Sequence, residues 1–166
     1  MTYYREIAAE LRTMATRDKE MRLAMHAGKA KWNAGIDHKN TARLKAIVAD
    51  IGWPTIAKVG KKAAAAAWLI AQHADADHTF QAQCLELMRE APRDDIDLSD
   101  LAYLEDRVRV NAGKLQLYGT QFYTKDTVLQ PRPIEESKQL DRRRKAMNLK
   151  PFAEYEAEMK AFYSGH

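Results

Sequence analysis

The chain has one cysteine, no long apolar run and no recognisable secretion signal. Cys84 alone cannot form an intrachain disulfide or a cysteine zinc site. Because Cys84 is surrounded in the sequence by apolar residues such as Phe80 and Leu85, we expect a buried side chain rather than a nucleophile. A membrane-spanning helix needs 18 or more apolar residues, and the N-terminal MTYYREIAAELR carries charges within its apolar pattern. These absences predict a soluble, cytoplasmic protein with no membrane contact.

Short motifs that mark common cofactor sites are also missing. The sequence contains no GxxxxGK[ST] or GxSxG, no GxGxxG after a strand, and no HExxH. His73 and Asp77 have the spacing of metal ligands, but no third ligand lies near them in the sequence. We therefore predict no metal and no tightly bound organic cofactor.

Positive charge is only weakly in excess. Lys and Arg number 27 and Asp and Glu number 23, which gives a net charge of +4, and the two signs are interspersed. The densest basic run, Arg142 to Lys145, follows Asp141 and is typical of a solvated helix face. This distribution argues against a nucleic-acid partner.

The chain has enough apolar residues to form one folded domain. The chain has 166 residues, 46% of them hydrophobic. Spacings of three and four predict a mainly α, compact single-domain bundle of about six or seven helices with one short β-hairpin. Its parts are a long N-terminal helix (1–28), a helical core (40–112), a hairpin (114–130) and C-terminal helices (134–147 and 151–163). Within the core, Gly60 splits one helix, and Asp75 or Asp77 caps the next one. The hairpin turns near residues 125–126.

Polar residues interrupt several apolar stripes, and such breaks are candidate site residues because burying an unpaired charge is costly. Asp18 and Arg22, four residues apart, share the apolar face of the first helix. His73 and Gln81 belong to QHADADHTFQ (72–81), where a buried helix ends and the next one begins. The alternative interpretations are an ion pair for Asp18 and Arg22 and a hydrogen-bonded structural role for His73.

The strongest breaks lie in the second half of the chain. Asp106 and Arg107 fall in LAYLEDRVRVNA, which is apolar on more than one face, and each requires its own partner. If LQLYGTQFY is a strand, Gln121 falls on its leucine face, and Gln116 and Tyr118 fall on the other face. The alternatives are structural hydrogen-bond networks around Asp106 and Arg107, and a hairpin with only a structural role.

Five stretches together resemble a bacterial family of unknown function, number 6624. They are IGWPTIAKVG (51–60), QHADAD with its following FQ (72–81), LAYLEDRV (101–108), GKLQLYGTQ (113–121) and RRR…NLKPFAEY (142–155). Asp18 and Arg22 extend the match, although Lys19 stands where the family pattern leads us to expect glutamine. The resemblance implies a compact domain that uses these polar motifs, and it implies no activity and no catalytic residues.

We expect these polar residues to line one pocket that holds a small phosphorylated or carboxylated molecule. In this hypothesis the protein is a transferase, hydrolase or lyase in which His73 and Asp106 are catalytic. The substrate-binding residues would be Arg107, Gln116, Tyr118, Gln121, Gln81, Arg22, Asp18 and Arg143. The alternatives are a non-catalytic binding module, such as a sensor or an immunity protein, and a protein-interaction domain with a structural polar network.

Overall fold

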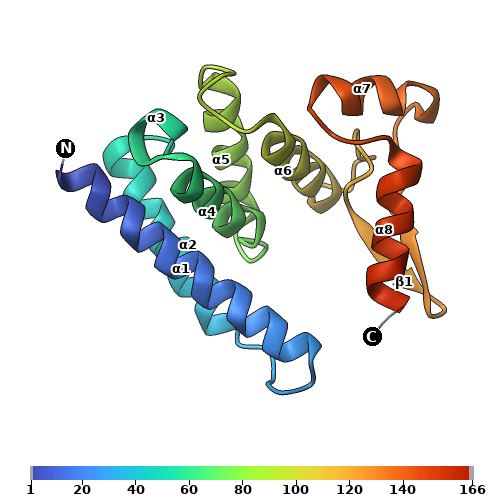
Figure 1. Ribbon diagram of the computed structural model, residues 1–166, viewed down its shortest axis with the longest axis horizontal. Coiled ribbons are helices and arrows are strands. Elements are labelled where there is room, and N and C mark those ends of the chain that lie inside the picture. Colours follow the sequence, from blue (N-terminus) through green and yellow to red (C-terminus); the bar gives the residue numbers. More distant parts are fainter. Residues whose placement is uncertain (1, 165–166) are drawn as a thin grey trace. The chain divides into compact units, whose positions relative to one another are not determined.

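The computed structural model describes residues 2–164, and the chain divides into two compact units, Met1–Asp97 and Leu98–His166. Within the described residues there are eight α-helices, one short 3-10 helix and one two-stranded antiparallel hairpin (Figure 1). The predicted mainly α fold with a single hairpin is therefore confirmed. The single-domain organisation stays a prediction.

The first unit is built around one alanine-rich helix. It contains α1 (Thr2–His26), α2 (Ala34–Ile51), α3 (Ile56–Val59), α4 (Lys61–Gln72) and α5 (His78–Glu90). Helix α4 contacts the other four, and Figure 1 shows α1 lying along it. Ala63, Ala67 and Ala71 are fully buried, since small side chains let neighbouring helices approach closely, and Leu11 and Leu44 complete this core.

The second unit joins a helix, a hairpin and two further helices. Helix α6 (Leu98–Asn111) leads through a loop to β1 (Phe122–Lys125) and β2 (Val128–Pro131), which pair from Phe122↔Pro131 to Lys125↔Val128. The 3-10 helix η1 (Ser137–Gln139), α7 (Leu140–Ala146) and α8 (Phe152–Ser164) follow, and α8 packs against α7 and β2. The ring of Tyr155 lies edge-on to that of Phe122, 5.8 Å between centroids.

Several predicted helix limits are confirmed. Gly60 separates α3 from α4 with φ of +80°, a conformation that glycine adopts without strain. Asp77 caps α5, because its carboxylate accepts a hydrogen bond from the backbone N–H of Phe80 at 3.0 Å. Asn148 follows α7 in the left-handed region, with φ of +57°.

Three predicted segments are wrong. Helix α2 begins at Ala34 instead of near residue 40, because the Asn33 side chain caps it by accepting from the N–H of Gly35. The strand predicted from residue 115 begins only at Phe122, and residues 113–121 form a loop. The helix predicted over 134–147 is shortened to η1 and α7, because Glu136 has φ of +40°, which ends any regular helix there.

Candidate functional site

The polar side chains at the end of α4 meet a carboxylate from α1. His73 immediately follows the last residue of α4, so its ring lies at the edge of the apolar core. Asp18 and Arg22 are one turn apart on α1, and Asp18 is only 1% exposed. Asp18 Oδ2 lies 2.9 Å from His73 Nδ1, across 55 positions of sequence. The predicted partnership of Asp18 and Arg22 is confirmed, and His73 joins it.

Arg22 links this buried carboxylate to a second one. Its Nε donates to both oxygens of Asp18, at 3.2 and 3.3 Å, and its Nη2 donates to Asp37 Oδ1 at 2.9 Å. The guanidinium also lies over the ring of Trp32, 4.7 Å from the centroid. We call Asp18, Arg22, Asp37 and His73 the His73 cluster.

Hydrogen bonding fixes which nitrogen of His73 can act on a ligand. Nδ1 is 3.0 Å from Arg22 Nε, but it cannot accept from Arg22 and donate to Asp18 at once. A buried carboxylate is the stronger partner, so the proton is assigned to Nδ1, which donates to Asp18. Nε2 has no hydrogen bond to any described residue, and the side chain is 21% exposed. The second nitrogen is therefore available to a ligand.

The two carboxylates of the cluster differ in their electrostatics. Burial acts most strongly on Asp18 and raises its pKa, but the bonds from His73 and Arg22 together hold that pKa below the usual value. Burial raises the pKa of Asp37, and the charge on Arg22 only partly offsets this effect. Asp18 is thus the residue that stays ionised beside His73.

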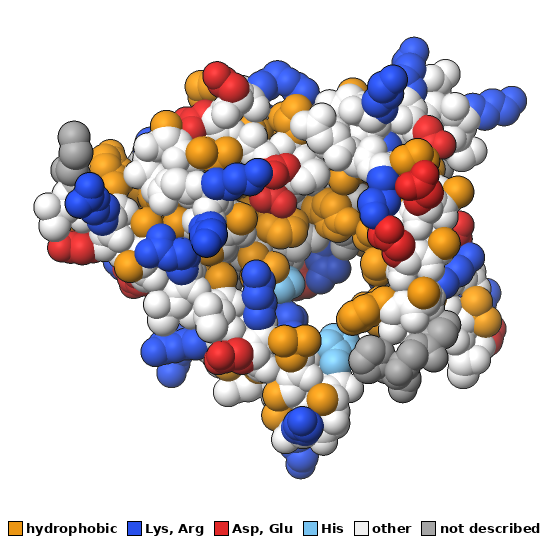
Figure 2. All heavy atoms as spheres, viewed as in Figure 1, with side chains coloured by type: hydrophobic (Ala, Val, Ile, Leu, Met, Phe, Trp, Pro, Cys, Tyr) orange, Lys and Arg blue, Asp and Glu red, His pale blue; other side chains and the backbone are white. Residues whose placement is uncertain are grey.

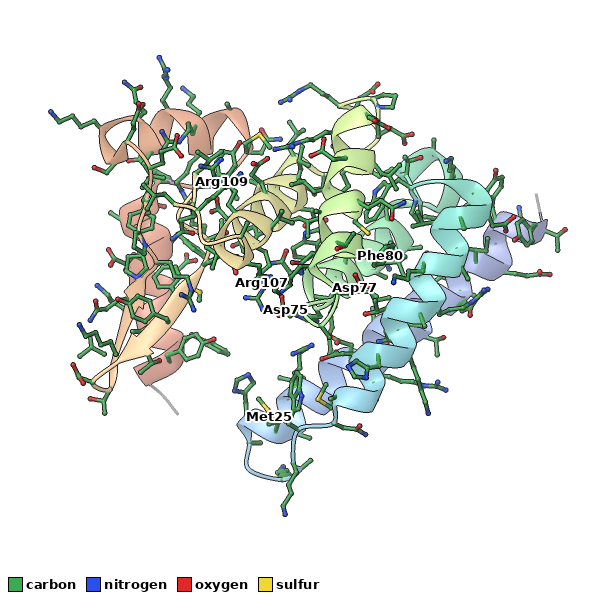
Figure 3. The ribbon with its side chains drawn as sticks, turned by 180° about the vertical axis from the view of Figure 1, so that it is seen from behind. Met25, Asp75, Asp77, Phe80, Arg107 and Arg109 are labelled. Carbon is green, nitrogen blue, oxygen red and sulfur yellow. The ribbon has the colours of Figure 1, made fainter. Side chains whose placement is uncertain are left out.

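Gln81 reinforces the turn that presents His73. Its side chain is fully buried, and Nε2 donates to the carbonyls of Ala71 and Gln72 at 3.1 and 3.2 Å and to Asp75 Oδ1 at 3.3 Å. Asp75 and Asp77 both lie in the turn before α5 (Figure 3). Gln81 therefore satisfies carbonyls at the end of α4, which a helix leaves without intrahelical partners. Its predicted role as a substrate ligand stays a prediction.

Asp106 organises a loop in the second unit. Its fully buried carboxylate accepts from the backbone N–H of Leu117 at 2.6 Å, of Tyr118 at 3.1 Å and of Thr120 at 3.0 Å. The Thr120 hydroxyl donates to it as well, at 2.9 Å. Burial raises the pKa of Asp106, and these donors oppose the increase. This arrangement holds the YGT turn in place, and a catalytic role for Asp106 stays a prediction.

Two arginines of α7 hold the same loop from its carbonyl side. Arg143 Nε donates to the carbonyl of Leu117 at 2.8 Å, and Arg144 Nη1 donates to that of Tyr118. Arg144 is 1% exposed, and its guanidinium lies 4.9 Å from the ring centroid of Tyr155. Sequence reasoning selected Arg143 and missed Arg144. The signal was available, because Leu140, Arg144 and Met147 share one face of α7.

The side-chain amides of Gln116 and Gln121 are held by backbone groups and by neighbouring side chains. Gln116 Nε2 donates to the carbonyls of Gln121 and Arg132, and Gln116 Oε1 accepts from the N–H of Gln121 at 2.8 Å. Arg107 Nη1 donates to Gln121 Oε1 at 3.0 Å. Asp106 and Arg107 thus have separate partners, as their 100° separation on a helix predicts. The expected alternation of residues 115–121 is wrong, since Gln116, Thr120 and Gln121 are all buried while Leu115 is 46% exposed.

The predicted site residues therefore form two groups. Asp18, Arg22, His73 and Gln81 belong to the first unit, and Asp106, Arg107, Gln116, Tyr118, Gln121 and Arg143 belong to the second. The prediction that both groups line one pocket stays a prediction. Sequence reasoning also missed Asp37 and Trp32 as partners of Arg22, because neither falls at a helical spacing from it.

The remaining sequence predictions concern metals, thiols and membranes. Among residues 2–164, no group of three or more His, Cys, Asp or Glu side chains is arranged to hold a metal ion. Cys84 is fully buried, as expected, and burial raises the pKa of its thiol to about 12. No helix in the described part of the chain has the length and apolar character needed to cross a membrane.

Comparison with known proteins identifies the family. A family model described as "Family of unknown function (DUF6624)" matches residues 9–165, nearly the whole chain. The chain belongs to the DUF6624 family. The predicted family is thereby confirmed. No curated protein and no solved structure matches this DUF6624 chain, so its function has to be inferred from its own residues.

Proposed function

We propose that this protein is a small enzyme in which His73 transfers protons for a reaction of a small anionic molecule. Asp18 holds the Nδ1–H of His73 at 2.9 Å and is itself 1% exposed, so the ring has one orientation and one tautomer. This single contact supports the function most directly. A buried carboxylate behind a half-buried imidazole is one arrangement that supports general acid–base catalysis.

The reaction class follows from what Nε2 can do. Neutral His73 accepts a proton at Nε2 from an attacking water or hydroxyl, and the imidazolium then returns that proton to the leaving group. Asp18 stays ionised and stabilises the imidazolium, because its pKa lies below the usual value. Hydrolysis and group transfer use this step, and in an elimination Nε2 would instead take a proton from a substrate carbon while the leaving group departs. Asp18 is therefore a positioning residue for His73.

The unbonded donors of the cluster, and not its net charge, favour an anionic substrate. When His73 is protonated, its charge and that of Arg22 only balance the two carboxylates Asp18 and Asp37. His73 Nε2 and Arg22 Nη1 have no hydrogen bond to a described residue, and Arg22 is 23% exposed. A carboxylate or phosphate can accept from both donors in charge-assisted bonds. The phosphorylated or carboxylated small molecule thus stays our proposed substrate class.

The test begins with binding and then measures turnover. Thermal stability of the wild-type protein is recorded against a panel of sugar phosphates, nucleotides and di- and tricarboxylates, because a bound ligand raises the melting temperature. Each stabilising compound is then followed by NMR for chemical change with the wild type, with His73→Gln and with His78→Gln. His78 is an exposed histidine five positions away and is the matched control.

The outcomes separate an enzyme from a binding module. The proposal predicts turnover by the wild type and His78→Gln, and binding without turnover by His73→Gln. Asp18→Asn should lower kcat with little change in KM, because it disturbs the orientation of the base. Binding of an anion without turnover by the wild type would instead indicate a sensor or sequestering protein. Failure of the whole panel to bind would refute the anionic substrate class.

A further inference from the structure

Basic side chains line two cavities along α1 in the first unit. A cavity of about 610 Å³ is lined by Arg5 and Arg12 of α1 and by Lys58 of α3. A second cavity of about 380 Å³ is lined by Arg12 and Lys19 of α1 and by Lys62 of α4. Arg12 borders both cavities, which lie between α1 and the α3–α4 segment, and we call the two together the α1 groove.

Most cations of the α1 groove have no partner in the protein. Arg5, Arg12 and Lys19 are seven residues apart, so they form one stripe with about 10.5 Å between neighbours and about 21 Å in total. Neither these side chains nor Lys62 form an ion pair or side-chain hydrogen bond with any described residue. None of the described residues that line the two cavities is Asp or Glu. Figure 2 shows basic side chains gathered over α1 and α4 on this face.

The floor of the groove is apolar and shallow. Ala8, Ala15 and Ala66 are buried at its base, and Leu69 is half-buried at its end. Small side chains between two helices allow a third backbone to approach closely. An apolar floor with cationic walls fits a helix whose contact face is apolar and whose flanks are acidic.

We propose that the α1 groove binds an acidic, amphipathic helical segment of a partner protein. The spacing sets the pattern of that segment: carboxylates seven residues apart would face Arg5, Arg12 and Lys19, and small or branched apolar side chains would face the alanines. About 14 residues of helix would cover the 21 Å stripe. This interaction is independent of the proton transfer proposed for His73.

A designed peptide tests the groove directly. A fluorescein-labelled helical peptide of about 20 residues, with Glu at seven-residue intervals flanking a Leu and Ala face, is titrated with the full-length protein by fluorescence anisotropy. The same peptide with Lys in place of Glu and a single-stranded oligonucleotide of equal charge are the comparison probes. We expect the acidic peptide to bind tightest, with an affinity that falls as the salt concentration rises.

Charge reversal locates the binding surface. The double variant Arg12→Glu and Lys19→Glu should weaken peptide binding at least about tenfold, since like charges then face each other across the interface. Arg142→Glu plus Lys138→Glu makes the same change in net charge at exposed positions of the second unit and should leave binding unchanged. His73→Gln should also bind normally, which separates this proposal from the proposed function.

Three results would overturn the proposal. Equal binding of the acidic and lysine peptides would exclude charge recognition. Equal loss in the two double variants, with circular dichroism confirming that both are folded, would show a general charge effect instead of a groove. Tighter binding of the oligonucleotide with the same dependence on Arg12 and Lys19 would assign the groove to nucleic acid.

Discussion

Removing the carboxylate of Asp106 should destabilise the second unit strongly. Asp106→Ala leaves four donors without their acceptor, namely the N–H groups of Leu117, Tyr118 and Thr120 and the Thr120 hydroxyl. Each buried donor left unsatisfied costs about 1–3 kcal/mol, so the lower limit sums to about 4 kcal/mol. Deleting a buried charge returns part of this cost, because burial also disfavours the ionised carboxylate. We expect a net loss of about 3 kcal/mol.

Urea unfolding followed by far-UV circular dichroism measures this effect. All three tryptophans lie in the first unit, so their fluorescence alone would not report it. A loss of about 3 kcal/mol corresponds to a fall in the urea midpoint of at least about 1 M. Asp94→Ala, at an exposed position, is the control and should change stability by less than about 0.5 kcal/mol. If Asp106→Ala unfolded within about 1 kcal/mol of the wild type, the carboxylate would not be what holds the loop.

Three further predictions follow from single contacts. Asp18→Asn should be less stable than the wild type at neutral pH, because the lowered pKa of Asp18 gives stability only while the carboxylate is ionised. The difference should begin to shrink as the pH falls below about 4 and disappear only below the lowered pKa of folded Asp18, and acid titration of both proteins by circular dichroism checks this sign. Gly119→Ala should lower the melting temperature clearly more than Gly113→Ala. Both glycines have φ near +70°, but only a Cβ at position 119 would meet Phe152, at 2.7 Å. Equal falls in melting temperature would contradict the packing argument. Asp77→Ala should lower the urea midpoint through the missing helix cap, whereas Asp77→Asn should lower it less, because an amide oxygen also accepts from the N–H of Phe80; urea unfolding of the two variants measures the difference.

Local patterns allowed part of the site to be predicted. Asp18 and Arg22 were placed on one face by their four-residue spacing, and Asp75 or Asp77 was expected to cap the following helix, of which Asp77 does so. These interactions join residues within one or two turns of helix, whose geometry is fixed. The loop at 113–121 could not be predicted in the same way, because its alternating sequence is typical of a strand. Its actual shape depends on Asp106 and on the arginines of α7, which are distant in sequence.

The helical class, the division of α3 from α4 at Gly60, the burial of Cys84 and the family could all be predicted from the sequence. The first two depend on periodicity and on backbone preferences that act over a few residues. The burial of Cys84 was predicted from its apolar neighbours, and the family from a resemblance of motifs. The tertiary structure was needed to show that Asp18 contacts His73, that Arg22 is shared with Asp37, and that Arg144 is buried against aromatic rings. Such contacts join distant segments, and a one-dimensional pattern shows that a buried charge needs a partner without showing which partner the packing supplies.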